Sequence, residues 1–324
     1  MDLMKIHQPY DLIGDIHGHA DALESLLLQL NYQPDGPGYR HPKGRNVIFL
    51  GDYIDRGPKI RRTLEIVRAM VDSGQALALM GNHEFNALTF HTPDGKGGWL
   101  RPHTEEKLHQ HAATLEQLAA PHPTEWRQWM DWFRTLPLFL ELPGLRAVHA
   151  AWDADAIELI RHLGPLNEEL LRQIAPKNTP LGRARNLLLC GRELRLPKGH
   201  FFTDKSGFQR HDIRLRWWEN PYGKTYRQMV FPDSDTVPEL PIPEKRMADL
   251  SEYPTGAPPV FMGHYWLPAN APCQPVARNI ACLDYSVAKG GRLTAYRWDG
   301  EGSLDTGKFV SVTHEANGRA NLKA

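Results

Sequence analysis

The amino-terminal part of the chain repeats one pattern three times: a short apolar run, a polar cluster with glycine, and a helix-like segment. The apolar runs are residues 10–13, 46–50 and 76–80. Strands that alternate with helices predict an α/β fold, in which a mostly parallel sheet is covered by helices. Right-handed crossovers then place the polar clusters at the carboxyl ends of the strands, the edge where open α/β sheets bind their ligands.

Two later apolar runs end on a histidine, His149 and His264, and they extend the strand pattern toward the C-terminus. Longer segments with a different pattern separate these runs from the first three and from each other. We therefore predict a single domain over residues 1–324, with a helical insertion at about 92–143 and an irregular, hairpin-containing insertion at about 153–257.

The helical insertion contains two segments whose apolar residues have helical spacing. In the second segment Trp126, Trp129 and Phe133 share one face, which indicates packing against the core. Several histidines also lie in this insertion without the spacing of a metal-binding motif. We expect a solvated helical surface for His103, His109, His111 and His122.

Composition narrows the classes of function. The 324 residues carry no net charge, so neither nucleic acid nor a membrane surface is an expected partner. The odd count of three cysteines, without a CxxC pair, argues against a disulfide framework and a thiolate zinc site. The sequence contains neither a signal-peptide pattern nor an apolar stretch of about 18 residues. A cytoplasmic protein is the expectation.

The residues that follow the apolar runs are carboxylates, imidazoles and one amide. Such a donor set suits Mn, Fe or Zn, and it contains enough groups for two ions. The polar residues that would converge at the strand ends are Asp15 and His17, then Asp52, Asp55 and Arg56, then Asn82, His83 and Glu84, and finally His149 and His264.

Three motifs carry a resemblance to a known family. GDIHG (14–18), GDYIDRG (51–57) and GNHE (81–84) resemble the signatures of the calcineurin-like metallophosphoesterase superfamily, in its phosphoprotein-phosphatase-type branch. The resemblance implies a sandwich of central β-sheets flanked by helices, with a dimetal site at the carboxyl ends of the strands. It also implies two divalent metal ions about 3.5–4 Å apart.

The resemblance further implies a role for each residue of the motifs. Asp15 and His17 would hold the first metal, and Asp52 would bridge both. The second metal would be completed by Asn82, His149 and His264.

The remaining motif residues would handle the substrate. His83 would be the general acid for the leaving oxygen, Asp55 would orient it, and Arg56 would clamp the phosphate. A metal-bridged hydroxide would attack phosphorus. A second phosphate-binding arginine is expected between the last two metal histidines, and among several candidates we assign Arg216, with Arg214 on the same predicted strand face.

The substrate class stays open between a phosphoprotein, a small phosphate ester and a nucleotide. The first hypothesis is a phosphomonoesterase similar to serine/threonine phosphatases. The alternative is a nucleotide or phosphodiester hydrolase that resembles the symmetrical diadenosine tetraphosphatases, for which Trp99, Trp152 and Tyr265 are candidate base-stacking residues. A non-catalytic metal-binding scaffold is the third hypothesis, and the complete set of metal donors argues against it.

Overall fold

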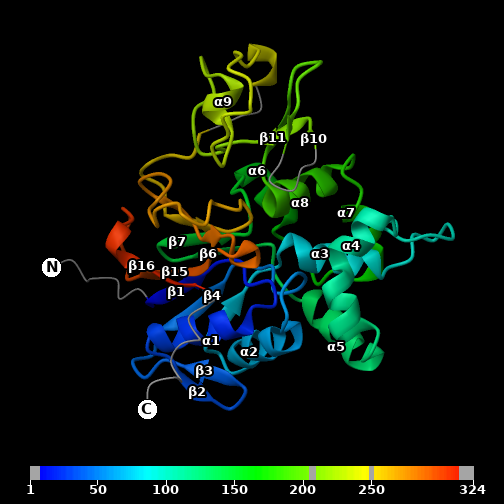
Figure 1. The fold of residues 1–324 in the computed structure, drawn as a ribbon, viewed down its shortest axis with the longest axis vertical. Coiled ribbons are helices and arrows are strands. Elements are labelled where there is room, and N and C mark those ends of the chain that lie inside the picture. Colours follow the sequence, from blue (N-terminus) through cyan, green and yellow to red (C-terminus); the bar gives the residue numbers. More distant parts are fainter. Residues whose placement is uncertain (1–7, 204–208, 248–251, 314–324) are drawn as a thin grey trace.

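The structure, a computed structural model, describes residues 8–203, 209–247 and 252–313 (Figure 1). Its centre is formed by two β-sheets. The larger sheet has the order β14-β15-β1-β4-β5, with β16 paired to β15. Strands β1, β4 and β5 are mutually parallel, and β15 is antiparallel to β1. These strands are β1 (Tyr10–Ile13), β4 (Asn46–Phe49), β5 (Ala76–Ala78), β14 (Asp284–Tyr285), β15 (Arg292–Trp298) and β16 (Phe309–Thr313).

The second sheet has the order β13-β12-β7-β6. Strand β12 is parallel to β7 and β13, whereas β6 and β7 form an antiparallel pair. The strands are β6 (Phe139–Leu142), β7 (Leu145–Val148), β12 (Val260–Met262) and β13 (Ile280–Cys282).

The two sheets pack face to face. Leu12 and Ile48 of the larger sheet share one buried cluster with Ala147 and Phe261 of the smaller sheet. Because side chains alternate along a strand, the neighbouring residue Ile13 belongs instead to the cluster that contains the helices. Burial on both faces explains why these strands are continuous apolar runs in the sequence.

Helices follow the first three predicted strands, as the sequence predicts. They are α1 (Ala20–Gln29), α2 (Ile60–Asp72) and α3 (Asn82–Phe90). The α/β sandwich with flanking helices is therefore confirmed. One feature differs from the single sheet edge expected at first: His149 and His264 follow β7 and β12, which belong to the second sheet.

The segment 92–143 contains the two predicted helices, α4 (Glu105–Thr114) and α5 (Pro123–Phe133), joined through a π-helical turn at Leu115–Ala119. Trp126, Trp129 and Phe133 are buried in the main core, which confirms their predicted packing role.

The segment 153–257 begins with three helices, α6 (Ala154–Ile160), α7 (Glu168–Ile174) and α8 (Pro180–Cys190). Two small ladders follow: β8 (Glu193–Arg195) pairs with β11 (Asp212–Arg214), and β9 (Phe202–Thr203) pairs with β10 (Gln209–Arg210). The latter is the predicted hairpin, and its turn lies outside the described residues. With α9 (Tyr226–Met229) these strands surround a separate small apolar cluster.

The remaining regular elements are short. A hairpin of β2 (Gln33–Asp35) and β3 (Gly38–Arg40) packs near α2, and 3₁₀ turns occur at Glu244–Arg246, Val287–Lys289 and Thr306–Lys308. Among the described residues, no helix combines the length and apolar character that crossing a membrane requires.

Candidate active site

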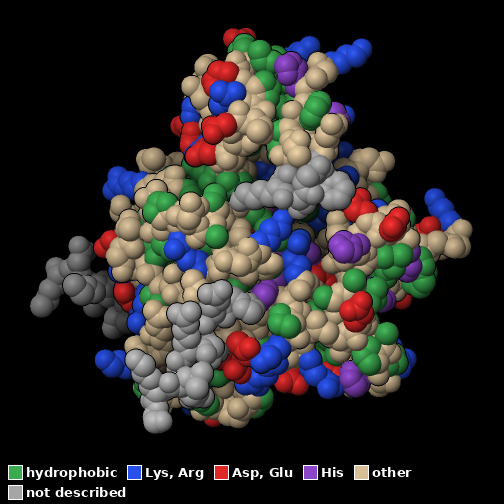
Figure 2. Space-filling model, in the orientation of Figure 1, with side chains coloured by type: hydrophobic (Ala, Val, Ile, Leu, Met, Phe, Trp, Pro, Cys, Tyr) green, Lys and Arg blue, Asp and Glu red, His purple; other side chains and the backbone are tan. Residues whose placement is uncertain are grey.

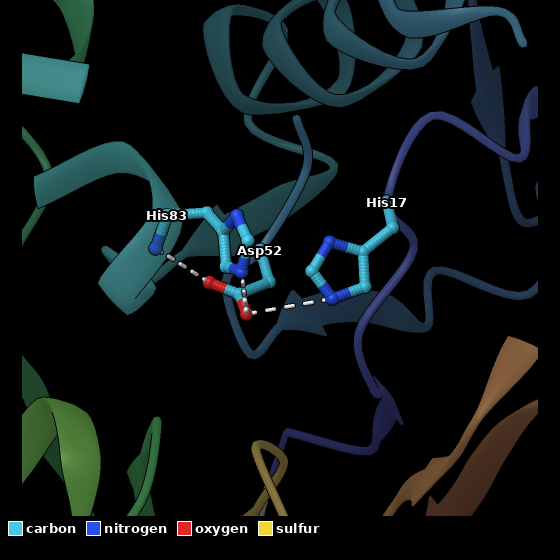
Figure 3. A group of neighbouring side chains, drawn as sticks. All are labelled: His17, Asp52 and His83. Atoms are coloured by element: carbon cyan, nitrogen blue, oxygen red, sulfur yellow. Dashed lines mark hydrogen bonds and ion pairs between the residues drawn. The ribbon is translucent and has the colours of Figure 1, made fainter. Parts of the chain in front are cut away.

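Asp52, directly after β4, is the centre of a buried group of polar side chains. Its Oδ2 lies 3.6 Å from His17 Nε2 and 3.9 Å from His83 Nε2 (Figure 3). Its Oδ1 lies 3.5 Å from His149 Nε2. Burial alone would raise the pKa of Asp52, but the imidazoles of His149 and His83 hold it well below its usual range. One ionised carboxylate thus faces two separate sets of imidazoles.

The second set of donors surrounds Asn82, the first residue of α3. Its Oδ1 lies 3.0 Å from His149 Nε2 and 2.7 Å from His264 Nδ1. The structure therefore brings together four predicted donors from β4, α3, β7 and β12, although the histidines lie 67 and 182 residues from Asn82 in the chain.

Asp15 lies beside this group rather than within it. Its carboxylate accepts the backbone N–H of His264, with Oδ2 3.0 Å from the nitrogen. A Cβ atom on Gly263 would lie 1.9 Å from Asp15 Oδ1, so the close approach of the two loops requires glycine. Burial and the nearby Asp284 raise the pKa of Asp15 well above its usual range.

Backbone carbonyls fix the orientation of two imidazoles. Nδ1 of His17 donates to Ile54 O at 3.0 Å, and Nδ1 of His149 donates to Leu50 O at 2.8 Å. A bond of this kind from Nδ1 is typical of metal-binding histidines, in which it orients the ring so that Nε2 faces the ion. Burial and the neighbouring His83 lower the pKa of His17 to about 3, so this ring is neutral.

The group fits divalent cations. Asp15, Asp52 and Asp284 are buried close together, and none forms an ion pair with a lysine or arginine in the described part of the chain. Nε2 of His17 and of His264 is buried without a hydrogen-bond partner there. Buried ionised carboxylates need a positive partner, and a buried imidazole nitrogen with a lone pair needs a hydrogen-bond donor or a metal ion. The donors are those expected for Mn, Fe or Zn.

Several residues of the group have a left-handed backbone. The φ angle is 47° at His17, 55° at Asp52, 67° at Asp55, 68° at Arg56 and 70° at His264. Such a conformation is strained for a residue with a side chain and persists where the surroundings determine it. The strain is thus concentrated in the loops that present the polar residues.

Glu84, the last residue of the GNHE motif, joins two of these loops. It accepts the backbone N–H groups of Gly81 and Asp52 at 2.9 Å and that of Tyr53 at 2.8 Å. The carboxylate satisfies donors at the start of α3 and in the loop after β4 together. We did not assign this role from the sequence, because the motif shows the residue but not its partners.

His83 and Asp55 form the predicted pair. His83 Nδ1 lies 2.5 Å from Asp55 Oδ2. The other carboxylate oxygen, Oδ1, accepts from His111 Nδ1 at 2.8 Å and from Thr114 Oγ1 at 2.5 Å. Burial would lower the pKa of His83, but the carboxylates of Asp52 and Asp55 outweigh it and raise the pKa above its usual value.

His111 corrects one sequence prediction. It is buried against Asp55, whereas His103, His109 and His122 are exposed as expected. His111 and Thr114 are three residues apart on α4 and therefore face the same way. That spacing is visible in the sequence, but the partner carboxylate lies 56 residues away and is not.

We predict that His111→Ala lowers kcat by about 10–100-fold, the usual effect of removing a residue that orients a functional side chain. His111→Asn, which keeps a donor near Nδ1, is expected to recover part of this loss. Steady-state kinetics on aryl and alkyl phosphates will measure both. Because His111 acts through His83, the loss is expected to be larger for the alkyl ester, and an equal loss for the two esters would contradict this role.

The arginines differ in their surroundings. Arg56 is exposed, and its guanidinium lies 4.3 Å from the ring centroid of Trp266. Arg216 pairs with Asp233 and Glu219 rather than with a residue of the polar group. Arg214 is half-buried and forms no ion pair among the described residues. Burial lowers the pKa of His264, and the positive charge of Arg214 lowers it further. We therefore propose Arg214 rather than Arg216 as the second phosphate-binding arginine.

The sequence profile of the calcineurin-like phosphoesterase family matches residues 9–264, which include every donor described above. The chain belongs to this family.

Named relatives of this phosphoesterase include nucleotide hydrolases. The symmetrical bis(5'-nucleosyl)-tetraphosphatase of Hamiltonella defensa is 29% identical over 89% of this chain and 93% of that protein. The asymmetrical tetraphosphatase PrpE of Oceanobacillus iheyensis is 40% identical over 22% of this chain and 29% of that protein. The corresponding PrpE of a Geobacillus strain is 30% identical over 45% of this chain and 59% of that protein. The chain thus spans less than two thirds of these PrpE proteins.

Among solved structures, a protein serine/threonine phosphatase from Saccharomyces cerevisiae aligns over 96% of this chain and 81% of its own. The TM-score is 0.47 and the identity is 11%.

Proposed function

We propose that this phosphoesterase hydrolyses dinucleoside polyphosphates such as diadenosine tetraphosphate, the alternative considered from the sequence, rather than phosphoserine or phosphothreonine. The observation that carries this proposal is the similarity to the Hamiltonella defensa symmetrical tetraphosphatase, which extends over 89% of the chain and therefore through both insertions. The three motifs alone are shared by both classes of enzyme.

Two divalent cations would be held by the polar group around Asp52. When bound, such ions lower the pKa of a coordinated water and offset charge on the phosphoryl oxygens. We propose that Asp52 contacts both ions and that Mn, Fe or Zn fills the sites. The first ion would be held by Asp15 and His17, and the second by Asn82, His149 and His264.

His83 would donate a proton to the leaving oxygen from Nε2. Asp55 accepts from Nδ1 and so favours the protonated imidazole. Arg56, exposed beside the group, would contact the phosphate through its guanidinium. The face of the molecule drawn in Figure 2 carries Lys and Arg side chains near its centre, close to α3. This positive charge suits a polyanionic substrate.

The candidate base-stacking residues lie in different environments. Trp152 and Tyr265 are buried and offer no face to a ligand, whereas Trp99 is 41% exposed. Trp99 also stacks on His103, with ring centroids 4.9 Å apart. Of these three residues, only Trp99 is available to a nucleobase.

We predict that chelation and dialysis abolish the activity and that Mn restores it, because the proposed mechanism needs the cations. The test compares diadenosine tetraphosphate, p-nitrophenyl phosphate and its bis ester, before and after chelation, with chromatography of the nucleotide products. ADP as the only nucleotide product would support symmetrical cleavage. A strong preference for the monoester would favour the phosphomonoesterase hypothesis, and full activity after exhaustive chelation would contradict the metal assignment.

A further inference from the structure

A depression with two basic side chains lies beside His83. Its lining includes Asp55, the α3 residues His83 and Asn86, and Arg101, Lys107 and Gln110 of the helical insertion. None of the six proposed metal donors lines it. The depression therefore adjoins the proposed proton donor rather than the metal cluster.

Arg101 is held by neutral groups. Its Nη1 donates to Asn86 Oδ1 at 2.9 Å, and its Nη2 donates to Gln110 Oε1 at 2.8 Å. It forms no ion pair with any carboxylate in the described ranges. The two amide oxygens fix the half-buried guanidinium without forming an ion pair with it.

Lys107 is also half-buried, and it has neither an ion pair nor a hydrogen bond among residues 8–203, 209–247 and 252–313. The carboxylates of Asp55 and Glu106 act electrostatically on Arg101, and both already accept hydrogen bonds from other groups. Asp55 accepts from His83, His111 and Thr114, and Glu106 accepts from Gln110 at 3.2 Å. Two basic groups that line one depression repel each other unless an anion is bound between them.

We propose that Arg101 and Lys107 bind the phosphates of the leaving nucleotide. In the proposed mechanism the attacked phosphorus lies next to the metal donors and Arg56, and the leaving oxygen lies next to His83. An anion in the adjoining depression is therefore the next phosphate beyond that oxygen. A seryl or nitrophenyl leaving group has no charge to place there, so the site would select polyphosphates, and the inference rests on the proposed function.

Lys107→Gln tests the site, because Lys107 has no hydrogen-bond or ion-pair partner to lose in the part of the chain that the structure describes. Lys96→Gln, in the same insertion but outside the depression, is the matched control. The measurement is inhibition of p-nitrophenyl phosphate hydrolysis by ADP and by inorganic phosphate in the metal-loaded full chain. We expect the inhibition constant of ADP to rise about tenfold in Lys107→Gln, the effect of one lost charge-assisted contact, and the constant of phosphate to rise much less.

The KM for diadenosine tetraphosphate is expected to rise in parallel, and Lys107→Glu is expected to enlarge both effects. Equal changes for ADP and phosphate, or no change in either Lys107 variant, would overturn the inference. A different outcome separates it from the proposed function: if ADP inhibition depends on Lys107 but wild-type protein does not cleave the tetraphosphate, the anion site stands and the proposed substrate fails.

Discussion

Replacing Asp52 by asparagine is expected to lower the metal-dependent kcat/KM by more than about 100-fold. This exceeds the usual effect of altering a residue that only hydrogen-bonds to a metal ligand. Asp52 faces both His17 and His149, so its charge would serve both cations. Asparagine has nearly the same shape and keeps an oxygen for the N–H of His83, which Asp52 Oδ1 accepts at 2.9 Å. The change therefore removes charge with little loss of packing.

The measurement combines kinetics in excess Mn with the metal content of the purified protein. Both the turnover and the number of bound ions are expected to fall. Asp21→Asn, at an exposed position of α1, is the matched control and should behave as wild type. Near-normal turnover of metal-replete Asp52→Asn would show that the assignment of Asp52 as the bridging ligand is wrong.

The parts of this site that the sequence predicts are those that depend on local pattern. Asp15, Asp52 and Asn82 each follow an apolar run, and a strand-end position is visible without any partner. The same holds for α2, where the apolar residues recur at helical spacing and are buried in the structure.

The contacts that the sequence does not predict are long-range pairings. Asp55 meets His111 across 56 residues, and nothing in the pattern of α4 distinguishes His111 from the exposed His109. Glu84 bonds to backbone groups 31 and 32 residues away, where the side-chain sequence carries no signal. The choice between Arg214 and Arg216 likewise depends on the carboxylates of Glu219 and Asp233, which neutralise only Arg216.

The helical insertion links these observations. It supplies His111 and Thr114 to the carboxylate of Asp55, and it supplies Arg101 and Lys107 to the depression beside His83. In the proposed mechanism the motifs of the family would hold the cations, whereas this insertion would support the proposed proton donor and shape its surroundings. Differences in substrate between relatives that share the motifs are therefore expected to arise from such insertions.

Replacing His83 by alanine is expected to lower kcat by about 10²–10⁴-fold for an alkyl phosphate, the range attributed to a positioned general acid. The loss should be smaller for p-nitrophenyl phosphate and for diadenosine tetraphosphate, because nitrophenolate and a nucleotide phosphate leave more readily than an alkoxide. His109→Ala, an exposed histidine of α4, is the matched control.

The pH profile separates this role from a structural one. Asp52 and Asp55 raise the pKa of His83, so the ring stays protonated to higher pH than an ordinary imidazole and loses its proton as the pH rises through the raised pKa. Wild-type kcat on the alkyl ester is therefore expected to fall on the basic side, and His83→Ala should lose this limb while retaining its metals. Because His83 Nε2 lies only 3.9 Å from Asp52 Oδ2, it is close enough to compete for a cation. Loss of both metals in His83→Ala would therefore identify it as a ligand and remove the general-acid assignment.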